Sequence, residues 1–279
     1  MRGWDGIWET SFGRLRLVQE GARVRGLYEC GGPSSVQGAA RDQALDFRYR
    51  EPKISGSGRF TLAPDGGSFT GRWRARGETK WSEWNGWRLS PEKGIAWLVV
   101  LEAHWQRSLD EPEYAFGNML REIFARTSLV RVRQRFFNDA ASVAQWCREL
   151  AYLPEPVILI IASHGVAEGL SVRGKLIDTK TVFDSLAYAG SLRLLHFSSC
   201  LVGLGRQRKQ AFAVSGYTTS VDWGASALLE FTYLDLMLNR GFDPAKAAAM
   251  LPTLVRFAGD RAPRGSPYPA AGFRFFPAR

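Results

Sequence analysis

The chain has 279 residues, of which 45% are hydrophobic and 23% charged, a composition typical of a globular protein with a substantial core. It has no run of about 18 apolar residues and no apolar stretch near its start, so we expect neither a membrane span nor a signal peptide. The cysteines Cys30, Cys147 and Cys200 lack Cys-x-x-Cys spacing. This argues against a disulfide framework or a zinc site and favours a reducing, cytoplasmic compartment.

The net charge of +10 comes mostly from arginine and raises the question of nucleic-acid binding. The basic residues are spread along the chain without a dense patch, and the sequence contains no RRM, zinc-finger or helix-turn-helix pattern. We therefore attribute the arginine content to a GC-rich bacterial genome and do not expect nucleic acid as a partner.

Residues 1–90 predict an antiparallel β-meander. Short runs of alternating polarity, such as residues 44–50 and 68–74, are separated by turn signals such as residues 64–67. Seven or eight such strands with interior aromatic residues suggest a closed or nearly closed barrel, which hides its strand edges. We expect this barrel to act as a sensor or docking domain for a regulatory partner or ligand.

Four tryptophans of the barrel have two possible roles. Trp73, Trp81, Trp84 and Trp87 could fill the core of a small barrel or line a ligand pocket. The spacing of three between the last three does not fit one face of a strand, so at least one should lie in a turn or on the surface.

Residues 91–279 predict an α/β domain with a mostly parallel sheet and flanking helices. The polar break at residues 90–94 marks its start. Apolar strand-like runs then alternate with helical spacing, which is typical of right-handed βαβ crossovers. The expected strands are residues 95–102, 129–136, 157–162, 192–197 and 211–216, and the expected helices are 114–124, 139–150, 179–189, 225–240 and 243–257.

Two of these strands end in residues that can carry chemistry. The strand 157–162 is followed by Ser163-His164-Gly165, and the strand 192–197 by Ser198-Ser199-Cys200. Open α/β sheets place their sites at the carboxyl ends of strands. A thiol nucleophile needs a base and two N–H groups for the oxyanion. We assign His164 as the base, Cys200 as the nucleophile, and the backbone N–H groups of Gly165 and Cys200 as the oxyanion donors. No third catalytic residue is evident, so a dyad is expected.

This order resembles the caspase-like (clan CD) cysteine peptidases, which include the bacterial CHAT domains. The similarity extends over about residues 94–257 and rests on His164-Gly165, on the hairpin-like residues 169–174, on residues 194–200 ending in Ser-Ser-Cys, and on the segment from residue 213 through Asp222 to the long helix. The chain departs from the CHAT pattern at Leu201, where an acidic or polar residue is usual. The resemblance implies a protein or peptide substrate, no cofactor and no metal.

The resemblance also implies substrate-binding residues. The S1 pocket of the family is often acidic and selects Lys or Arg, and Asp222 is the acidic candidate here, unless it caps a helix or lies on the surface. Ser198 and His104 are further candidates for substrate contact. His196, in mid-strand, is expected to be packed or exposed rather than catalytic.

The sequence therefore predicts a cysteine endopeptidase for regulated intracellular proteolysis, in bacterial defence or cell death. Two alternatives remain open. One is a catalytically inactive caspase-like scaffold, and the other is a ligand- or nucleic-acid-binding protein that acts through the barrel.

Overall fold

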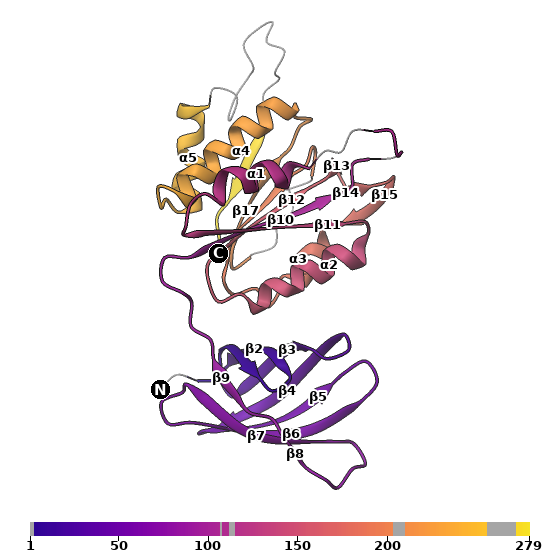
Figure 1. Ribbon diagram of the computed structural model, residues 1–279, viewed down its shortest axis with the longest axis vertical. Helices are drawn as coiled ribbons and strands as arrows, with labels where there is room; N and C mark the ends of the chain where they lie inside the picture. The colour runs from indigo at the N-terminus through magenta and orange to yellow at the C-terminus, as the bar shows by residue number, and fades with distance from the viewer. Residues whose placement is uncertain (1–2, 107, 112–114, 203–209, 256–271) are drawn as a thin grey trace, which may run out of the picture. The chain divides into compact units, whose positions relative to one another are not determined.

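The computed structural model describes residues 3–106, 108–111, 115–202, 210–255 and 272–279 (Figure 1). The chain divides into two compact units, Met1–Glu92 with Ala151–Pro154, and Lys93–Leu150 with Glu155–Arg279. Within the described ranges, no helix is both long enough and apolar enough to cross a bilayer.

The first unit is a closed antiparallel β-barrel. Its strands are β1 (Gly6–Thr10), β2 (Gly13–Glu20), β3 (Arg23–Glu29), β4 (Pro33–Arg41), β5 (Ala44–Arg50), β6 (Ser55–Leu62), β7 (Ser68–Ala75), β8 (Ser82–Glu83) and β9 (Gly86–Arg88). Neighbours in sequence pair from β1 to β7, and β9 closes the ring by pairing with both β1 and β7. The short β8 adds to β7 outside the ring. The predicted antiparallel barrel is confirmed.

The interior of the barrel is filled by aromatic side chains. Alternate residues of each strand point inward, so the strands deliver a packed core. Buried aromatic residues include Trp4, Trp8, Tyr28, Phe47, Phe60, Phe69 and Trp84. Of the four tryptophans with two possible roles, Trp84 is buried and Trp73 packs against the core, whereas Trp81 and Trp87 are 37% and 56% exposed. The aromatic residues inside the barrel therefore form a packed core. Of the three tryptophans spaced three residues apart, two lie on the surface, as that spacing predicted.

The second unit is built on a six-stranded, mostly parallel sheet. Its elements are β10 (Ala96–Ala103), α1 (Phe116–Phe124), β11 (Val130–Phe137), α2 (Ala140–Glu149), β12 (Val157–Ala162), β13 (His164–Val166), β14 (Gly169–Val172), β15 (Lys175–Asp178), α3 (Thr179–Ser185), β16 (Leu192–Ser198), β17 (Ala213–Tyr217), α4 (Trp223–Leu238), α5 (Pro244–Leu254) and β18 (Phe273–Phe276). A 3₁₀ turn (Leu150–Tyr152) follows α2, and its last two residues belong to the first unit. The strand order is β11-β10-β12-β16-β17-β18, and the last strand is antiparallel to its neighbour. The predicted α/β architecture is confirmed, and the edge strand β18 is an addition to it.

Helices cover both faces of this sheet. Helices α1, α4 and α5 pack on one face, and α2 and α3 lie on the other (Figure 1). The central strand β12 is buried along its whole length, as its unbroken apolar run predicted. Asp139 caps α2 by accepting a hydrogen bond from the N–H of Ser142 at 2.8 Å. After β12 the chain enters a small three-stranded sheet, β13-β14-β15.

Candidate active site

Two serines fix the ends of strands β12 and β16 to each other. The strands are parallel neighbours, with Ala162 beside Ser198 at their carboxyl ends. Just beyond, the N–H of Ser163 donates to Oγ of Ser199 at 3.2 Å, and the two hydroxyl oxygens lie 3.2 Å apart. Both serines are buried, so these contacts satisfy polar groups that would otherwise be costly. The chain that leaves one strand is therefore held against the chain that leaves the other.

Gly165 and Cys200 lie in contact through their backbones. A Cβ atom on Gly165 would lie 1.9 Å from the carbonyl oxygen of Cys200 and 2.9 Å from a methyl carbon of Val202. Since no side chain fits in that space, close packing requires glycine here. This packing requirement is separate from the role of oxyanion donor that the sequence assigned to the Gly165 N–H. His164 is thus one residue away from a direct contact with Cys200.

The His164 side chain is exposed and packs against a tryptophan. The rings of His164 and Trp105 meet edge-to-face, with centroids 4.9 Å apart and an interplanar angle of 86°. Trp105 follows β10, the neighbour of β12, and therefore lies at the same edge of the sheet. Its indole N–H donates to Oε1 of Glu102 at 2.7 Å. Trp105 restricts the orientation of the imidazole.

Glu102 is a fully buried carboxylate at the end of β10 with four hydrogen-bond donors. Besides the Trp105 indole, the N–H groups of Phe116 and Gly117 donate to it at 2.7 and 3.0 Å, and Nε2 of Gln134 donates at 2.8 Å. The two backbone donors belong to the N-terminus of α1, where N–H groups lack partners within the helix and favour a negative charge. Sequence reasoning missed both Glu102 and Trp105. The feature of the sequence that could have indicated Glu102 is an acidic residue directly after the apolar run of a strand.

The Cys200 thiol faces the segment that follows β17. Its Sγ accepts a hydrogen bond from the N–H of Val221 at 3.3 Å and lies 3.7 Å from the Val221 carbonyl oxygen. The next residue, Leu201, has φ of 55°, a left-handed conformation that is uncommon outside glycine, and its N–H donates to the carbonyl of Thr219. This turn leaves Cys200 half-buried at the sheet edge. Strained backbone of this kind clusters at functional sites.

Two backbone N–H groups near the site are candidates for binding an oxyanion. Val166 and Gly169 flank a two-residue loop and form the last pair of the β13–β14 hairpin, and in hairpins with two-residue loops this closing pair is the hydrogen-bonded type. The next pair, Gly165 with Leu170, is therefore of the non-hydrogen-bonded type, and the N–H of Gly165 points away from β14. In the part of the chain that the structure describes, the N–H of Cys200 has no acceptor. These are the two groups that the sequence assigned as oxyanion donors.

His104 and Ser198, two of the substrate-contact candidates, have structural contacts. The His104 ring stacks on Phe136, with centroids 4.5 Å apart and an interplanar angle of 17°. Ser198 ends β16, is half-buried, and accepts a backbone hydrogen bond from Ser163 at 3.4 Å. Both residues lie at the carboxyl edge of the sheet.

Asp222 begins α4 as its N-cap. Its Oδ1 accepts hydrogen bonds from the N–H groups of Gly224 and Ala225 at 2.8 and 3.2 Å. Helix capping is one of the roles that the sequence left open for this residue. The preceding residue, Val221, contacts the thiol of Cys200, so the carboxylate is also close in the chain to the candidate nucleophile.

Two tryptophans form an aromatic surface beside His164. Trp223, at the start of α4, is 42% exposed, and its ring centroid lies 5.9 Å from Trp105 and 5.7 Å from Phe116. Trp105 in turn contacts His164. The exposed ring of Trp223, beside the half-buried ring that contacts the candidate base, provides a surface against which a substrate side chain can pack.

His196 is a core residue, in line with its mid-strand position. Its Nδ1 lies 2.9 Å from Oγ of Ser215, and its Nε2 lies 3.2 Å from Oε1 of Glu230, although without hydrogen-bond geometry. The same carboxylate oxygen accepts a hydrogen bond from the hydroxyl of Tyr217 at 2.9 Å. Burial, together with Glu230, raises the pKa of Tyr217 well above its ordinary value. This network stabilises the junction of β16, β17 and α4.

The other two cysteines lie in different surroundings from Cys200. All three are free. Cys147 is fully buried on α2, and desolvation raises the pKa of its thiol to about 12. Cys30 lies in the barrel, where burial and then the neighbouring Glu51 raise the pKa of its thiol. Cys200 is thus the cysteine at the carboxyl edge of the parallel sheet.

Comparisons with known proteins identify structural neighbours alone. No protein-family model matches the chain, and no curated protein matches it. Among solved structures it is similar to the Drosophila initiator caspase Dronc, with 10% identity, a TM-score of 0.48, and coverage of 66% of this chain and 79% of that one. Caspase-1 from Spodoptera frugiperda is 8% identical, with a TM-score of 0.47 and coverage of 68% of this chain and 88% of that one. A structure described as pro-sf-caspase-1 is also 8% identical, with a TM-score of 0.45 and coverage of 66% of this chain and 92% of that one.

Proposed function

We propose that this protein is a cysteine endopeptidase in which His164 and Cys200 form the catalytic dyad. The observation that carries the proposal is the close backbone contact between Gly165 and Cys200. A Cβ atom built on Gly165 would lie only 1.9 Å from the carbonyl oxygen of Cys200. It brings the residue after the histidine against the cysteine, at the sheet edge where parallel α/β sheets carry their sites. The exposed imidazole and the half-buried thiol are both within reach of a ligand.

In the first half-reaction, His164 removes the thiol proton and the thiolate of Cys200 attacks the scissile carbonyl carbon. The carbonyl electron pair moves to oxygen, and this oxyanion accepts hydrogen bonds from the N–H groups of Gly165 and Cys200. The adduct then collapses with cleavage of the C–N bond. The leaving amine takes the proton from His164, and the acyl group remains on sulfur as a thioester.

In the second half-reaction, His164 removes a proton from water, and the resulting hydroxide attacks the thioester carbon. The C–S bond breaks, the acid product leaves, and the thiol is restored as the sulfur recovers its proton from His164. Trp105 limits rotation of the imidazole through both steps, since it packs against the ring and is itself held by Glu102.

The substrate is a protein or peptide, and Asp222 selects Lys or Arg before the scissile bond. The carboxylate retains one oxygen, Oδ2, that makes no hydrogen bond to the described residues, and it follows the residue that contacts the Cys200 thiol. A carboxylate in this position would pair with a guanidinium or ammonium group. The aromatic rings of Trp105 and Trp223 would pack against the apolar stem of such a side chain.

We assign residues 1–90 to a barrel domain that senses or docks a partner and residues 91–279 to the peptidase domain. The three free cysteines support a reducing compartment such as the cytoplasm. The resemblance of the His-Gly and Ser-Ser-Cys motifs to caspase-like and CHAT peptidases supports a role in regulated bacterial proteolysis, in defence or cell death.

A panel of peptide-aminomethylcoumarin substrates with Arg, Lys or Asp before the scissile bond tests the proposal. Wild-type protein should cleave a substrate with Arg or Lys, and Cys200→Ala and His164→Ala should each lower kcat/KM by at least about 100-fold. Cys147→Ala, which removes a buried thiol, is the matched control and should retain activity. Equal activity in wild type and Cys200→Ala would refute the dyad. A folded wild type that cuts none of these peptides would favour the inactive scaffold.

A further inference from the structure

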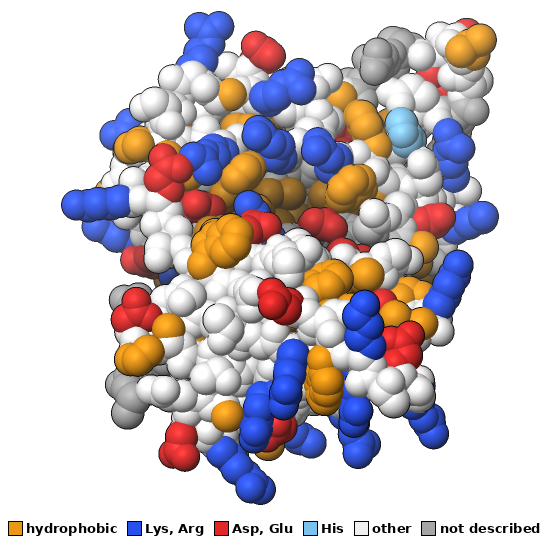
Figure 2. Space-filling model, turned by 60° about the horizontal axis from the view of Figure 1, so that its bottom comes forward, with side chains coloured by type: hydrophobic (Ala, Val, Ile, Leu, Met, Phe, Trp, Pro, Cys, Tyr) orange, Lys and Arg blue, Asp and Glu red, His pale blue; other side chains and the backbone are white. Residues whose placement is uncertain are grey.

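The barrel gathers on one outer face the arginines that are scattered in the sequence. Outward-facing positions alternate with core positions along β5, β6 and β7, and many of the outward ones are basic. The arginines of this face are Arg48, Arg50, Arg59, Arg72, Arg74 and Arg76. The sequence alone shows no dense basic patch, whereas strand pairing creates one. Over the surface seen in Figure 2, Lys and Arg side chains project more often than Asp and Glu, in keeping with the net charge of +10.

The strand register arranges four of these arginines in two rows, each with a serine in the middle. The rows are Arg48–Ser57–Arg74 and Arg50–Ser55–Arg76. Because adjacent strands lie about 4.8 Å apart, the two arginines of a row rise from backbones about 10 Å apart. The serine between them has a short side chain, so the middle of each row is lower than its two ends, where long basic side chains project.

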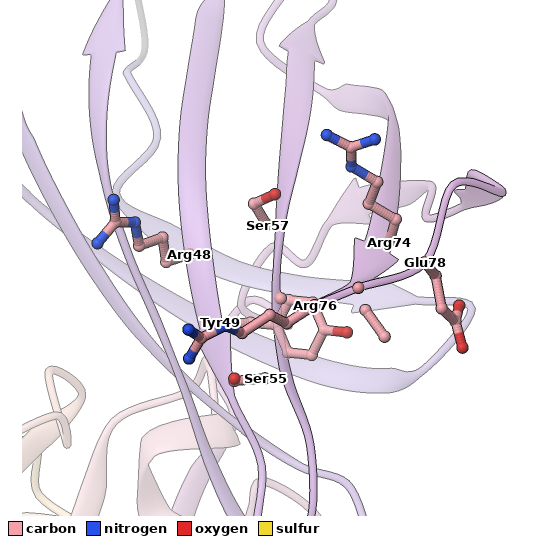
Figure 3. Close-up of a pocket in the computed structure, with 10 residues that line it drawn as sticks. Arg48, Tyr49, Ser55, Ser57, Arg74, Arg76 and Glu78 are labelled. Atoms are coloured by element: carbon pink, nitrogen blue, oxygen red, sulfur yellow. The ribbon is translucent and has the colours of Figure 1, made fainter.

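Residues of both rows line an open groove on the barrel surface. A hollow of about 740 Å³ is lined by Arg48, Arg74 and Arg76, with Ser57 between the first two (Figure 3). A second hollow, of about 540 Å³, is lined by Arg72 and Trp81 among others. Arg48 and Ser57 line both hollows, so the two adjoin each other. We call this surface the arginine groove. Its extended, open shape suits a chain-like ligand better than a compact one.

The positive charge of the arginine groove is largely uncompensated. Among the described residues, the arginines Arg48, Arg72, Arg74 and Arg76 that line the hollows form no salt bridge, whereas Arg59 is paired with Asp46 at 2.8 Å. Other exposed arginines of the barrel, such as Arg14 on β2 and Arg25 on β3, have carboxylate partners. The acidic residues that line the two hollows are Glu78 and Asp46. Four unpaired arginines along a groove would displace counterions from a polyanion.

An exposed aromatic ring distinguishes between classes of polyanion. The guanidinium groups of Arg72 and Arg74 lie 4.8 and 4.6 Å from the centroid of the Trp81 ring, which is 37% exposed. Arginines that follow a backbone, combined with an exposed ring on which a base can stack, are the elements by which proteins bind single strands. An acidic peptide has no base to stack, and in a duplex the bases are not accessible. We propose that the arginine groove binds single-stranded nucleic acid, which departs from the sequence-based expectation.

Fluorescence anisotropy with a labelled oligonucleotide of about 16 nucleotides, as oligo(dT) or oligo(U), tests this inference on the full chain. If the four unpaired arginines each neutralise one phosphate, the logarithm of the binding constant should fall with the logarithm of salt concentration with a slope of about −2.8. The two oligonucleotides show whether DNA or RNA is preferred.

The matched variants are Arg48→Gln/Arg74→Gln and Arg14→Gln/Arg25→Gln. Both remove two positive charges from exposed barrel strands, and the second lies outside the groove. In about 0.1 M salt the groove variant should bind about 25-fold more weakly and have a slope smaller by about 1.4, while the control should match wild type. Trp81→Ala should weaken binding about tenfold with an unchanged slope. Circular dichroism melting curves verify that each variant is folded.

Three results would overturn the inference. Wild-type protein could fail to bind either oligonucleotide, or bind with a slope near zero. The groove variant could bind as tightly as the control variant. Polyglutamate of equal charge could compete as well as unlabelled oligonucleotide, with Trp81→Ala unchanged, which would assign the groove to acidic proteins. None of these outcomes bears on cleavage by Cys200, because the residues that line the arginine groove all belong to the barrel unit.

Discussion

Gly165→Ala places a methyl group where the structure has the carbonyl oxygen of Cys200. An ordinary contact would need 3.4 Å or more, but the available distance is 1.9 Å, so the two backbones must separate by about 1.5 Å. The obstruction is backbone, which cannot turn aside as a flexible side chain can. Overpacking of this kind costs about 1–3 kcal/mol of folding free energy. Since a displacement of about 1 Å can reduce a rate about 100-fold, kcat/KM should fall by at least that factor.

The control for this change is Gly174→Ala, in the turn between β14 and β15 of the same small sheet. Gly174 has φ of 75° and no atom within 4 Å of a would-be Cβ, so alanine there is strained but does not collide. The left-handed conformation should cost about 1–2 kcal/mol. The two variants should therefore be similarly destabilised in urea unfolding, whereas only Gly165→Ala should lose peptidase activity. Activity within a few-fold of wild type in Gly165→Ala, at unchanged stability, would refute the close contact between the two strand ends.

Three further substitutions test separate parts of the site. Trp105→Leu should lower kcat/KM by up to about tenfold, because the edge-to-face contact that orients His164 is lost; Trp97→Leu, within β10, should not, and equal effects would contradict the positioning role. Asp222→Asn keeps a good N-cap and removes the charge, so kcat/KM for Arg or Lys substrates should fall about 10- to 100-fold while helix stability is kept; unchanged selectivity would leave Asp222 as a cap only. Cys147 makes the stability of the fold depend on pH in alkali. The pKa of its thiol is about 9 in the unfolded chain and about 12 in the folded protein, so the unfolded chain loses this proton first. The free energy of unfolding should therefore fall by about 1.4 kcal/mol per pH unit as the pH rises between those two values. Cys147→Ala should show a shallower decline in urea unfolding measured from pH 9 to 10.5, and identical slopes would be evidence against the buried thiol.

The parts of the fold that follow from local pattern could be predicted from the sequence. The unbroken apolar run of β12 indicated a strand buried on both faces, and the alternation in residues 44–50 indicated a half-buried barrel strand. His164 and Cys200 were found because each directly follows such a run. These features depend on a few consecutive residues, so periodicity and turn signals are sufficient.

The contacts that shape the site could not be predicted in this way. Glu102 receives donors from a helix N-terminus, a neighbouring strand and an indole, and those partners are fixed only once α1 and β11 have packed on the sheet. The collision that requires Gly165 to be glycine involves the carbonyl of Cys200, on another strand. Arg48 and Arg74 share a row only because β6 pairs with both β5 and β7. Such relations depend on register and side-chain direction, which a one-dimensional pattern does not contain.

The central claim is that Cys200 is a nucleophile activated by His164, and labelling with an electrophilic peptide probe tests it most directly. The protein is incubated with a chloromethyl ketone peptide ending in arginine, and the modified cysteine is identified by mass spectrometry, with the buried Cys147 and the barrel Cys30 as internal references. The account predicts modification at Cys200 alone, and loss of that modification in His164→Ala. Labelling spread over all three cysteines, or Cys200 labelling that persists unchanged in His164→Ala, would contradict it.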